Sequence, residues 1–138
     1  MAEALILDSE ALNALANPTQ RGSLTRRARA IARIAHERGV LLRVPAPVLA
    51  EVCRGARFDA AINQLLNREA IGVADLTREI AQRAGALLGK ASMSSANAID
   101  AFVVATALEF EASVIATGDA KDLRRLSAPY RQVSLMQL

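Results

Sequence analysis

The sequence contains one cysteine and one histidine in 138 residues, and this shortage removes whole classes of chemistry. The single cysteine, Cys53, cannot form an internal disulfide, which suits a reducing cytosol. A catalytic thiol needs a nearby base, but His36 falls in a different predicted helix, so we expect Cys53 to be a small core residue. One Cys and one His are too few for a zinc site built from these residues. The same lack of histidine disfavours Ser-His-Asp catalysis. The carboxylates are left to carry the chemistry.

Aromatic residues and long apolar runs are also scarce. The aromatic residues are Phe58, Phe102, Phe110 and Tyr130, so a base-stacking sheet for single-stranded nucleic acid is not expected. The apolar stretch at 101–108 is too short to span a bilayer. Residues 1–12 carry acids but no Lys or Arg, unlike a secretory signal. We therefore expect a cytoplasmic protein without membrane contact.

The composition is typical of a folded protein with a basic surface. Hydrophobic residues make up 52% of the chain and charged residues 22%, which predicts a single domain over residues 1–138. The net charge is +3, from 17 basic and 14 acidic residues. If several acids gather at one site, the rest of the surface is more basic still and would attract a polyanion.

Short apolar segments alternate with amphipathic ones along the whole sequence. Strands separated by helices imply crossover connections, and hence a mostly parallel sheet covered on both faces. The sequence thus predicts an α/β fold, a three-layer α/β/α arrangement with a central sheet of about five strands. The expected strands are 4–8, 40–45, 71–76, 114–116 and 132–136, and the expected helices are 9–16, 23–38, 47–55, 59–69, 78–90, 97–110 and 120–126.

Residues typical of helix ends support several of these boundaries. The Asn17-Pro18 pair should end the first helix, and Gly39 should follow the end of the helix at 23–38. Thr77 is a suitable N-cap for the helix at 78–90.

Acidic residues stand where the predicted strands end or the helices begin. Asp8 ends the first strand, and Asp119 follows the fourth strand after Thr117-Gly118. Ligands of parallel sheets bind beyond the carboxyl ends of the strands, and these two ends can be adjacent in space. Glu51 lies in the helix after the second strand, and Asp100 lies one turn into the apolar helix at 97–110. We expect these acids to meet at one edge of the sheet.

Asp100 is the most informative of the four acids. An isolated carboxylate at the start of a buried helix is costly, so it should serve a cation, a helix end or a hydrogen-bond network. Carboxylates that converge raise one another's pKa unless a divalent cation neutralises them. Oxygen ligands without His or Cys select Mg²⁺ or Mn²⁺, which can activate water and stabilise a phosphodiester under cleavage.

Each of the candidate site residues could instead serve only the local structure around it. Asp8 and Asp119 could cap the helices that follow them, Thr117 could do the same, and Asn97 fits an N-cap better than a substrate contact. Glu51 could be an ordinary surface residue.

Four segments taken together resemble a known family. "LILDSEALNAL" with Asp8, "VPAPVLAEVCRG" with Glu51, "NAIDAFVVATAL" with Asp100 and "VIATGDAKDL" with Asp119 look like the four acidic motifs of the PIN domain, in the same order. The whole chain is similar in length and layout to the VapC toxins of bacterial VapBC toxin–antitoxin systems.

The resemblance implies a Mg²⁺- or Mn²⁺-dependent endoribonuclease that cleaves transfer RNA or another structured RNA. It also implies a cognate VapB-like antitoxin, a homodimer and a higher assembly with the antitoxin. Asp8, Glu51, Asp100 and Asp119 would hold the metal, directly or through water, with Asp122 as a further, more distant acid. The hydroxyl positions Ser9 and Thr117, together with Asn97, would support the acids or the substrate. Glu10 departs from the family, which more often has Asn or another small polar residue there; it could bind metal or face solvent.

The helix at 23–38 carries a dense set of arginines. They could contact the RNA backbone, form an ordinary solvated face, or meet an acidic partner. The candidates for RNA contact are Arg26, Arg27, Arg29 and Arg33.

Two other functions stay open. A catalytically inactive domain of the same fold could bind RNA or protein. A phosphatase or receiver on another doubly wound fold is disfavoured, because such a phosphatase needs a second Asp two residues after Asp8 and Glu10 stands there.

Overall fold

The computed structural model describes residues 3–138, except for the side chains of residues 18–21. Five parallel strands form one sheet in the order β3-β2-β1-β4-β5. These strands are β1 (Glu3–Leu7), β2 (Leu41–Pro45), β3 (Gly72–Ala74), β4 (Ala112–Thr117) and β5 (Val133–Gln137).

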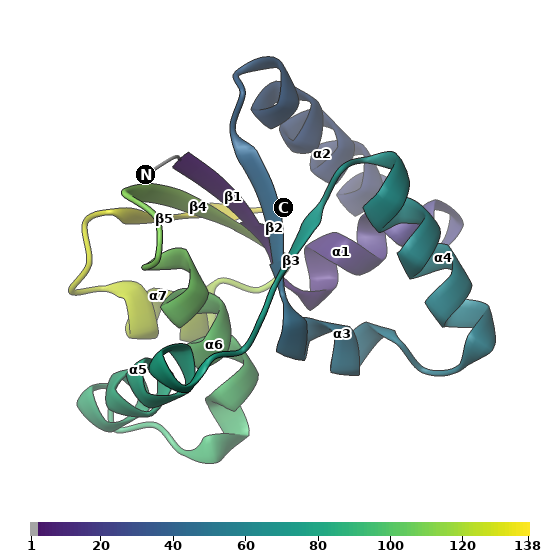
Figure 1. Cartoon of the computed structure of the whole chain (residues 1–138). Helices are drawn as coiled ribbons and strands as arrows, with labels where there is room; N and C mark the ends of the chain where they lie inside the picture. The colour runs from purple at the N-terminus through teal and green to yellow at the C-terminus, as the bar shows by residue number, and fades with distance from the viewer. Residues whose placement is uncertain (1–2) are drawn as a thin grey trace.

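Helices cover both faces of this sheet (Figure 1). In that view α1, α2 and α4 lie to one side of the strands, and α5, α6 and α7 lie to the other. The predicted three-layer α/β/α fold is confirmed, and every pairing between the strands is parallel. The helices are α1 (Ser9–Ala16), α2 (Pro18–Glu37), α3 (Ala46–Val52), α4 (Ala56–Arg68), α5 (Arg78–Lys90), α6 (Ala98–Ala107) and α7 (Lys121–Ser127), with a 3₁₀ turn η1 (Ser95–Asn97) before α6.

The core is deepest around the central strands β1 and β4. Ile6 of β1 and Ile115 of β4 are fully buried, as is Val104 of α6, which packs on the sheet. Central strands of a parallel sheet are covered on both faces and therefore consist of apolar runs. The apolar sequence of α6 has the same cause, since six of its ten residues are buried.

The register of the sheet places the ends of β1, β4 and β5 at one edge. Leu7 of β1 pairs with Ala116 of β4, and Thr117 of β4 pairs with Gln137 of β5. The backbone N–H of Asp8 continues this ladder by donating to the carbonyl of Ala116 at 3.2 Å. The predicted meeting of the first and fourth strand ends is therefore present.

The largest difference concerns α2, which includes a helical turn from Pro18 ahead of the predicted start at residue 23. The Asn17-Pro18 pair does end α1, but proline is also favoured in a first helical turn, so the next helix starts at once. Gly22, with φ 45° and ψ −109°, is not helical and separates this first turn from the rest of α2, so the long helix does start after Gly22, as predicted.

A second correction concerns α3 and α4. α3 ends at Val52 and not at residue 55, because Gly55 takes φ 123° and turns the chain into α4, which starts three residues earlier than predicted. α6 ends at Ala107 and not at residue 110, since the chain must turn there to enter β4.

β3 is shorter than predicted, because its partner β2 ends at Pro45 and only three residue pairs form. β4 is longer than predicted, because it pairs with strands on both sides. The other boundaries match to within about one residue, as helix and strand ends generally do.

Two predicted helix ends are confirmed. The Thr77 hydroxyl accepts from the backbone N–H of Ile80 at 3.1 Å and caps α5. Gly39 has φ 70° just after α2, a conformation that favours glycine. No helix within residues 3–138 is long and apolar enough to cross a membrane.

Cys53 is half-buried and packs against the core, as expected. Burial raises the pKa of its thiol, and the neighbouring Asp59 carboxylate raises it further. The thiol is therefore poorly suited to act as a nucleophile.

Candidate active site

Acidic residues from four separate segments meet at the carboxyl edge of the sheet. Asp100, in the first turn of α6, has a pKa raised to about 6. Burial is the main cause, and the negative charges of three other acids raise it further, namely Asp122, Glu51 and Asp119. Since charge effects weaken with distance, α3, α6, the β4–α7 connection and α7 all bring carboxylates into one electrostatic site.

Asp8 joins this site from the end of β1. It is 8% exposed, and burial raises its pKa from 3.8 to about 6. Hydrogen bonds from Thr117 and from the backbone N–H of Ala11 (2.9 Å) oppose this rise, while the charges of Glu10 and Asp100 add to it. Asp8 thus caps α1 and also belongs to the acidic site, so the two interpretations of this residue are compatible.

Thr117 links the acid at the end of β1 to the acid that follows β4. Its hydroxyl is fully buried, accepts from the backbone N–H of Asp119 at 3.0 Å and lies 3.0 Å from the Asp119 carbonyl. The same hydroxyl forms a hydrogen bond with the Asp8 carboxylate. It fixes the position of Asp119 relative to Asp8.

Two neutral side chains hold two of the other acids. The Ser9 hydroxyl donates to Oε1 of Glu51, which joins the first turn of α1 to α3. Asn97 Nδ2 donates to Oδ2 of Asp122 at 3.0 Å, which joins the start of α6 to α7. Asn97 occupies the N-cap position of α6, as expected, but its side chain makes no capping bond there. Its amide N–H instead donates to Asp122.

Asp119 is exposed at the rim of the site. Its Oδ1 accepts from the backbone N–H of Lys121 at 3.2 Å, at the first residue of α7, although Ala120 and not Asp119 occupies the N-cap position. This single bond leaves carboxylate oxygen available toward the other acids.

Sequence reasoning missed Gln137, the last residue of β5. Its Nε2 donates to the Gly118 carbonyl at 2.5 Å, and its Oε1 accepts from the backbone N–H of Ala120 at 3.0 Å. These two contacts bracket Asp119. No local pattern could have indicated them, because they depend on the pairing of β4 with β5.

The donor set has the chemistry of a site for a hard divalent cation. All of its charged groups are carboxylates, and burial together with the neighbouring acids raises the pKa of Asp8 and of Asp100. Within residues 3–138, however, no three Asp, Glu, His or Cys side chains are close enough to share one ion. Ser9 and Asn97 hold Glu51 and Asp122 in their present positions.

The predicted arginines are all exposed on α2. Arg29 and Arg33 line a hollow of about 420 Å³ together with Leu42 and Ile71, which belong to the amino ends of β2 and β3. The acids lie at the opposite, carboxyl ends of the strands. Contact of these arginines with RNA stays a prediction.

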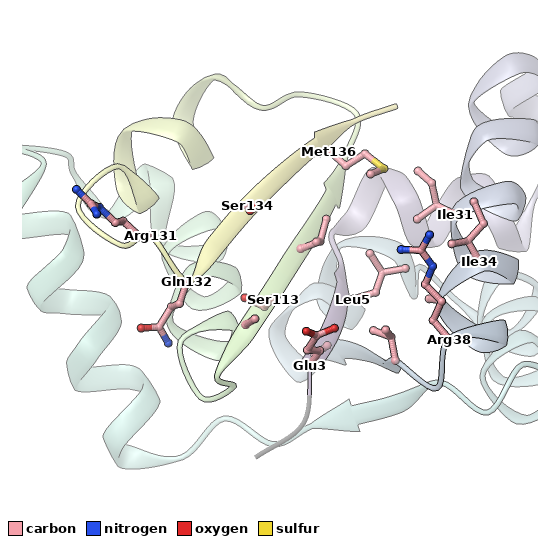
Figure 2. Close-up of a pocket in the computed structure, with 15 residues that line it drawn as sticks. Glu3, Leu5, Ile31, Ile34, Arg38, Ser113, Arg131, Gln132, Ser134 and Met136 are labelled. Carbon is pink, nitrogen blue, oxygen red and sulfur yellow. The ribbon is translucent and has the colours of Figure 1, made fainter.

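A second hollow of about 350 Å³ opens over β1, β4 and β5. Figure 2 shows Leu5 on the sheet, with Ile31 and Ile34 reaching toward it from α2 and Arg38 from just after this helix. None of the predicted site residues lines this mostly apolar hollow, so it is separate from the acidic site.

Comparison with known proteins agrees with this geometry. The family model of the PIN domain matches residues 5–129, a stretch that includes all of the predicted acids. No curated protein matched the sequence. A chain from a toxin–antitoxin complex of Klebsiella pneumoniae has a similar structure, with a TM-score of 0.65 and 20% sequence identity; the match covers 98% of this chain and 100% of that chain. At this identity the likeness shows the fold, whereas the family match shows that the chain belongs to the PIN domain family.

Proposed function

We propose that this chain is a Mg²⁺- or Mn²⁺-dependent endoribonuclease and the toxin of a type II toxin–antitoxin pair. PIN domains are generally nucleases, so family membership supports a hydrolase that acts on nucleic acid. The dependence on metal, the choice of RNA and the role as a toxin go beyond family membership and belong to the proposal.

The observation that carries the proposal is the electrostatic coupling of Asp100 with Asp122, Glu51 and Asp119, and of Asp8 with Asp100. A fold stabilised only by its core gains nothing from this arrangement, because buried like charges are destabilising. Perturbed carboxylates of this kind concentrate at functional sites.

The residues that would hold the ion are Asp8, Glu51, Asp100 and Asp119, with Asp122 as a further acid. When bound there, a divalent ion would supply an activated water and balance the charge on the phosphodiester. Thr117 keeps Asp8 and Asp119 in fixed relation, Ser9 orients Glu51, and Asn97 orients Asp122. The burial of Asp8 limits the access of bulk water to the inner side of the site.

The role as a toxin rests on two supports. The described fold is similar to that of a chain in a toxin–antitoxin complex. The whole chain is also similar in length and layout to the VapC toxins. On this proposal the partners are RNA and a VapB-like antitoxin, the protein is cytoplasmic, and it forms a homodimer that assembles further with the antitoxin.

The test is cleavage of a structured RNA, such as a transfer RNA transcript, by the purified chain with Mg²⁺ or Mn²⁺ and with EDTA. We expect cleavage that requires the metal and is lost in Asp8→Asn and Asp100→Asn. Glu37→Gln, which removes an exposed acid at the end of α2, should cleave like the wild type. Cleavage that survives both aspartate substitutions would refute the proposal.

A catalytically inactive module that binds RNA or protein is the second candidate. The observation in its favour is that no three acidic side chains of residues 3–138 are already placed to share an ion. Calorimetry separates the two functions: saturable Mn²⁺ binding supports the nuclease, whereas RNA binding without Mn²⁺ binding supports the inactive module.

A further inference from the structure

The connection from β4 to α7 is held by hydrogen bonds at nearly every peptide group. The Thr117 carbonyl accepts from the backbone N–H of Leu138 at 2.9 Å, and the Ala120 carbonyl accepts from the N–H of Arg124 at 2.8 Å. The Thr117 hydroxyl accepts from the Asp119 N–H. The side-chain amide of Gln137 bonds two further groups of this connection, the Gly118 carbonyl and the Ala120 N–H.

The side-chain amide of Gln137 has the donor and the acceptor needed to bond both groups. A primary amide offers a donor and an acceptor side by side, so one side chain can bond a carbonyl and an N–H that lie two residues apart. Ala120 is 2% exposed, so without Gln137 its N–H would have little access to water as a substitute partner. The parallel register, which sets Gln137 beside Thr117, delivers the amide to this point.

We propose that Gln137 is a positioning residue for Asp119. It acts through the backbone on either side of Asp119 and so sets where this carboxylate lies relative to Asp8 and Asp100. The inference rests on the proposed function, because position matters most if Asp119 helps to hold an ion. Mutation of a group that orients a metal ligand typically weakens metal binding by about 10- to 100-fold.

The test compares Gln137→Met with a matched control at the other end of β5. The side-chain amide of Gln132 also donates to backbone carbonyls, to that of Phe110 at 2.9 Å and to that of Leu108 at 3.4 Å. These carbonyls do not belong to the acids of the candidate site. Both substitutions keep the side-chain length and remove the amide. Gln132→Met therefore reports the structural cost of losing such a contact, away from the acidic site.

The first readout is amide hydrogen exchange in the metal-free protein. Gln137→Met should speed the exchange of the Ala120 N–H by about fivefold or more, while Gln132→Met leaves it unchanged. The second readout is the dissociation constant for Mn²⁺ from calorimetry. Gln137→Met should weaken binding about 10-fold, and Gln132→Met should stay within about twofold of the wild type. In RNA cleavage, Gln137→Met should lower kcat with little change in KM.

Unchanged Ala120 exchange in Gln137→Met would overturn the proposal, because the amide would then not hold the loop. Faster exchange with wild-type Mn²⁺ affinity and kcat would overturn it as well, because Asp119 would not depend on the loop. A wild-type protein that neither binds Mn²⁺ nor cleaves RNA would instead refute the proposed function, and the exchange readout would still decide whether Gln137 holds the loop.

Discussion

Glu10 of α1 lies against Gly118 so closely that a Cβ atom on Gly118 would stand 2.8 Å from the Cβ of Glu10. The first turn of α1 therefore packs directly on the end of β4, and this contact brings the segments of Asp8 and Asp119 together. The sequence left open whether Glu10 faces solvent or joins the site. In the structure it adjoins the site, and its charge helps to raise the pKa of Asp8.

Gly118→Ala should lower the free energy of unfolding by about 1–3 kcal/mol, because the added methyl group has no room beside Glu10. It should also reduce RNA cleavage, since Asp119 must shift with the loop. Chemical denaturation and a cleavage assay measure the two effects.

Gly85→Ala in α5 is the matched control. No atom lies within 4 Å of a Cβ built there, and alanine favours a helix by about 0.5–1 kcal/mol over glycine, so this variant should be slightly more stable than the wild type. Equal stability of Gly118→Ala and the wild type would contradict the close packing of Glu10.

Asp8→Asn should stabilise the metal-free protein near pH 7.5 even though it abolishes cleavage. The pKa of Asp8 is about 6 in the folded protein, above the ordinary 3.8, so the folded state favours the protonated acid. The stabilisation of the fold by protonated Asp8 is therefore fully present at low pH and is lost as the pH rises through about 6. A shift of this size corresponds to about 3 kcal/mol at neutral pH. Asparagine remains a good N-cap for α1.

Denaturation of both proteins in EDTA across a pH series measures this effect. The advantage of Asp8→Asn should be largest above the folded pKa and vanish below the unfolded one. An advantage independent of pH would mean that the buried charge is not its cause.

Mn²⁺ should raise the melting temperature of the wild type at pH 7.5 and have little effect at about pH 5. Asp8 and Asp100 both titrate near pH 6, and a cation must compete with protons for them. Thermal scans with Mn²⁺ and with EDTA test this expectation. Asp100→Asn should lose most of the metal-dependent shift, and an equal shift in this variant would remove Asp100 from the metal site.

Thr117→Val should be destabilised by about 1–3 kcal/mol, because the N–H of Asp119 would lose its partner, the hydroxyl of the fully buried Thr117. Thr117→Ser keeps the hydroxyl and loses only a methyl group. It should retain cleavage and cost about 1 kcal/mol. Thermal denaturation and cleavage of the two variants provide the measurement, and equal cleavage by both would show that the hydroxyl does not position the acids.

The sequence alone indicated the order of the elements and the class of the site. Apolar runs such as 114–116 indicate strands that are buried on both faces. The apolar residues around Asp100 likewise predict that their helix is buried. Acids at strand ends can be expected to meet, because parallel strands all end at one edge. These features follow from local patterns and from the rules of parallel sheets, and both can be read along the chain.

Only the tertiary structure decided which side chains hold the acids. Asn97 bonds Asp122 instead of capping α6, Glu10 packs on Gly118, and Gln137 brackets Asp119. Each of these contacts joins residues at least 17 positions apart, and each depends on the register of strands and the placement of helices. A change of one residue in that register would point every side chain of a strand to the other face, so no local pattern can specify such partners.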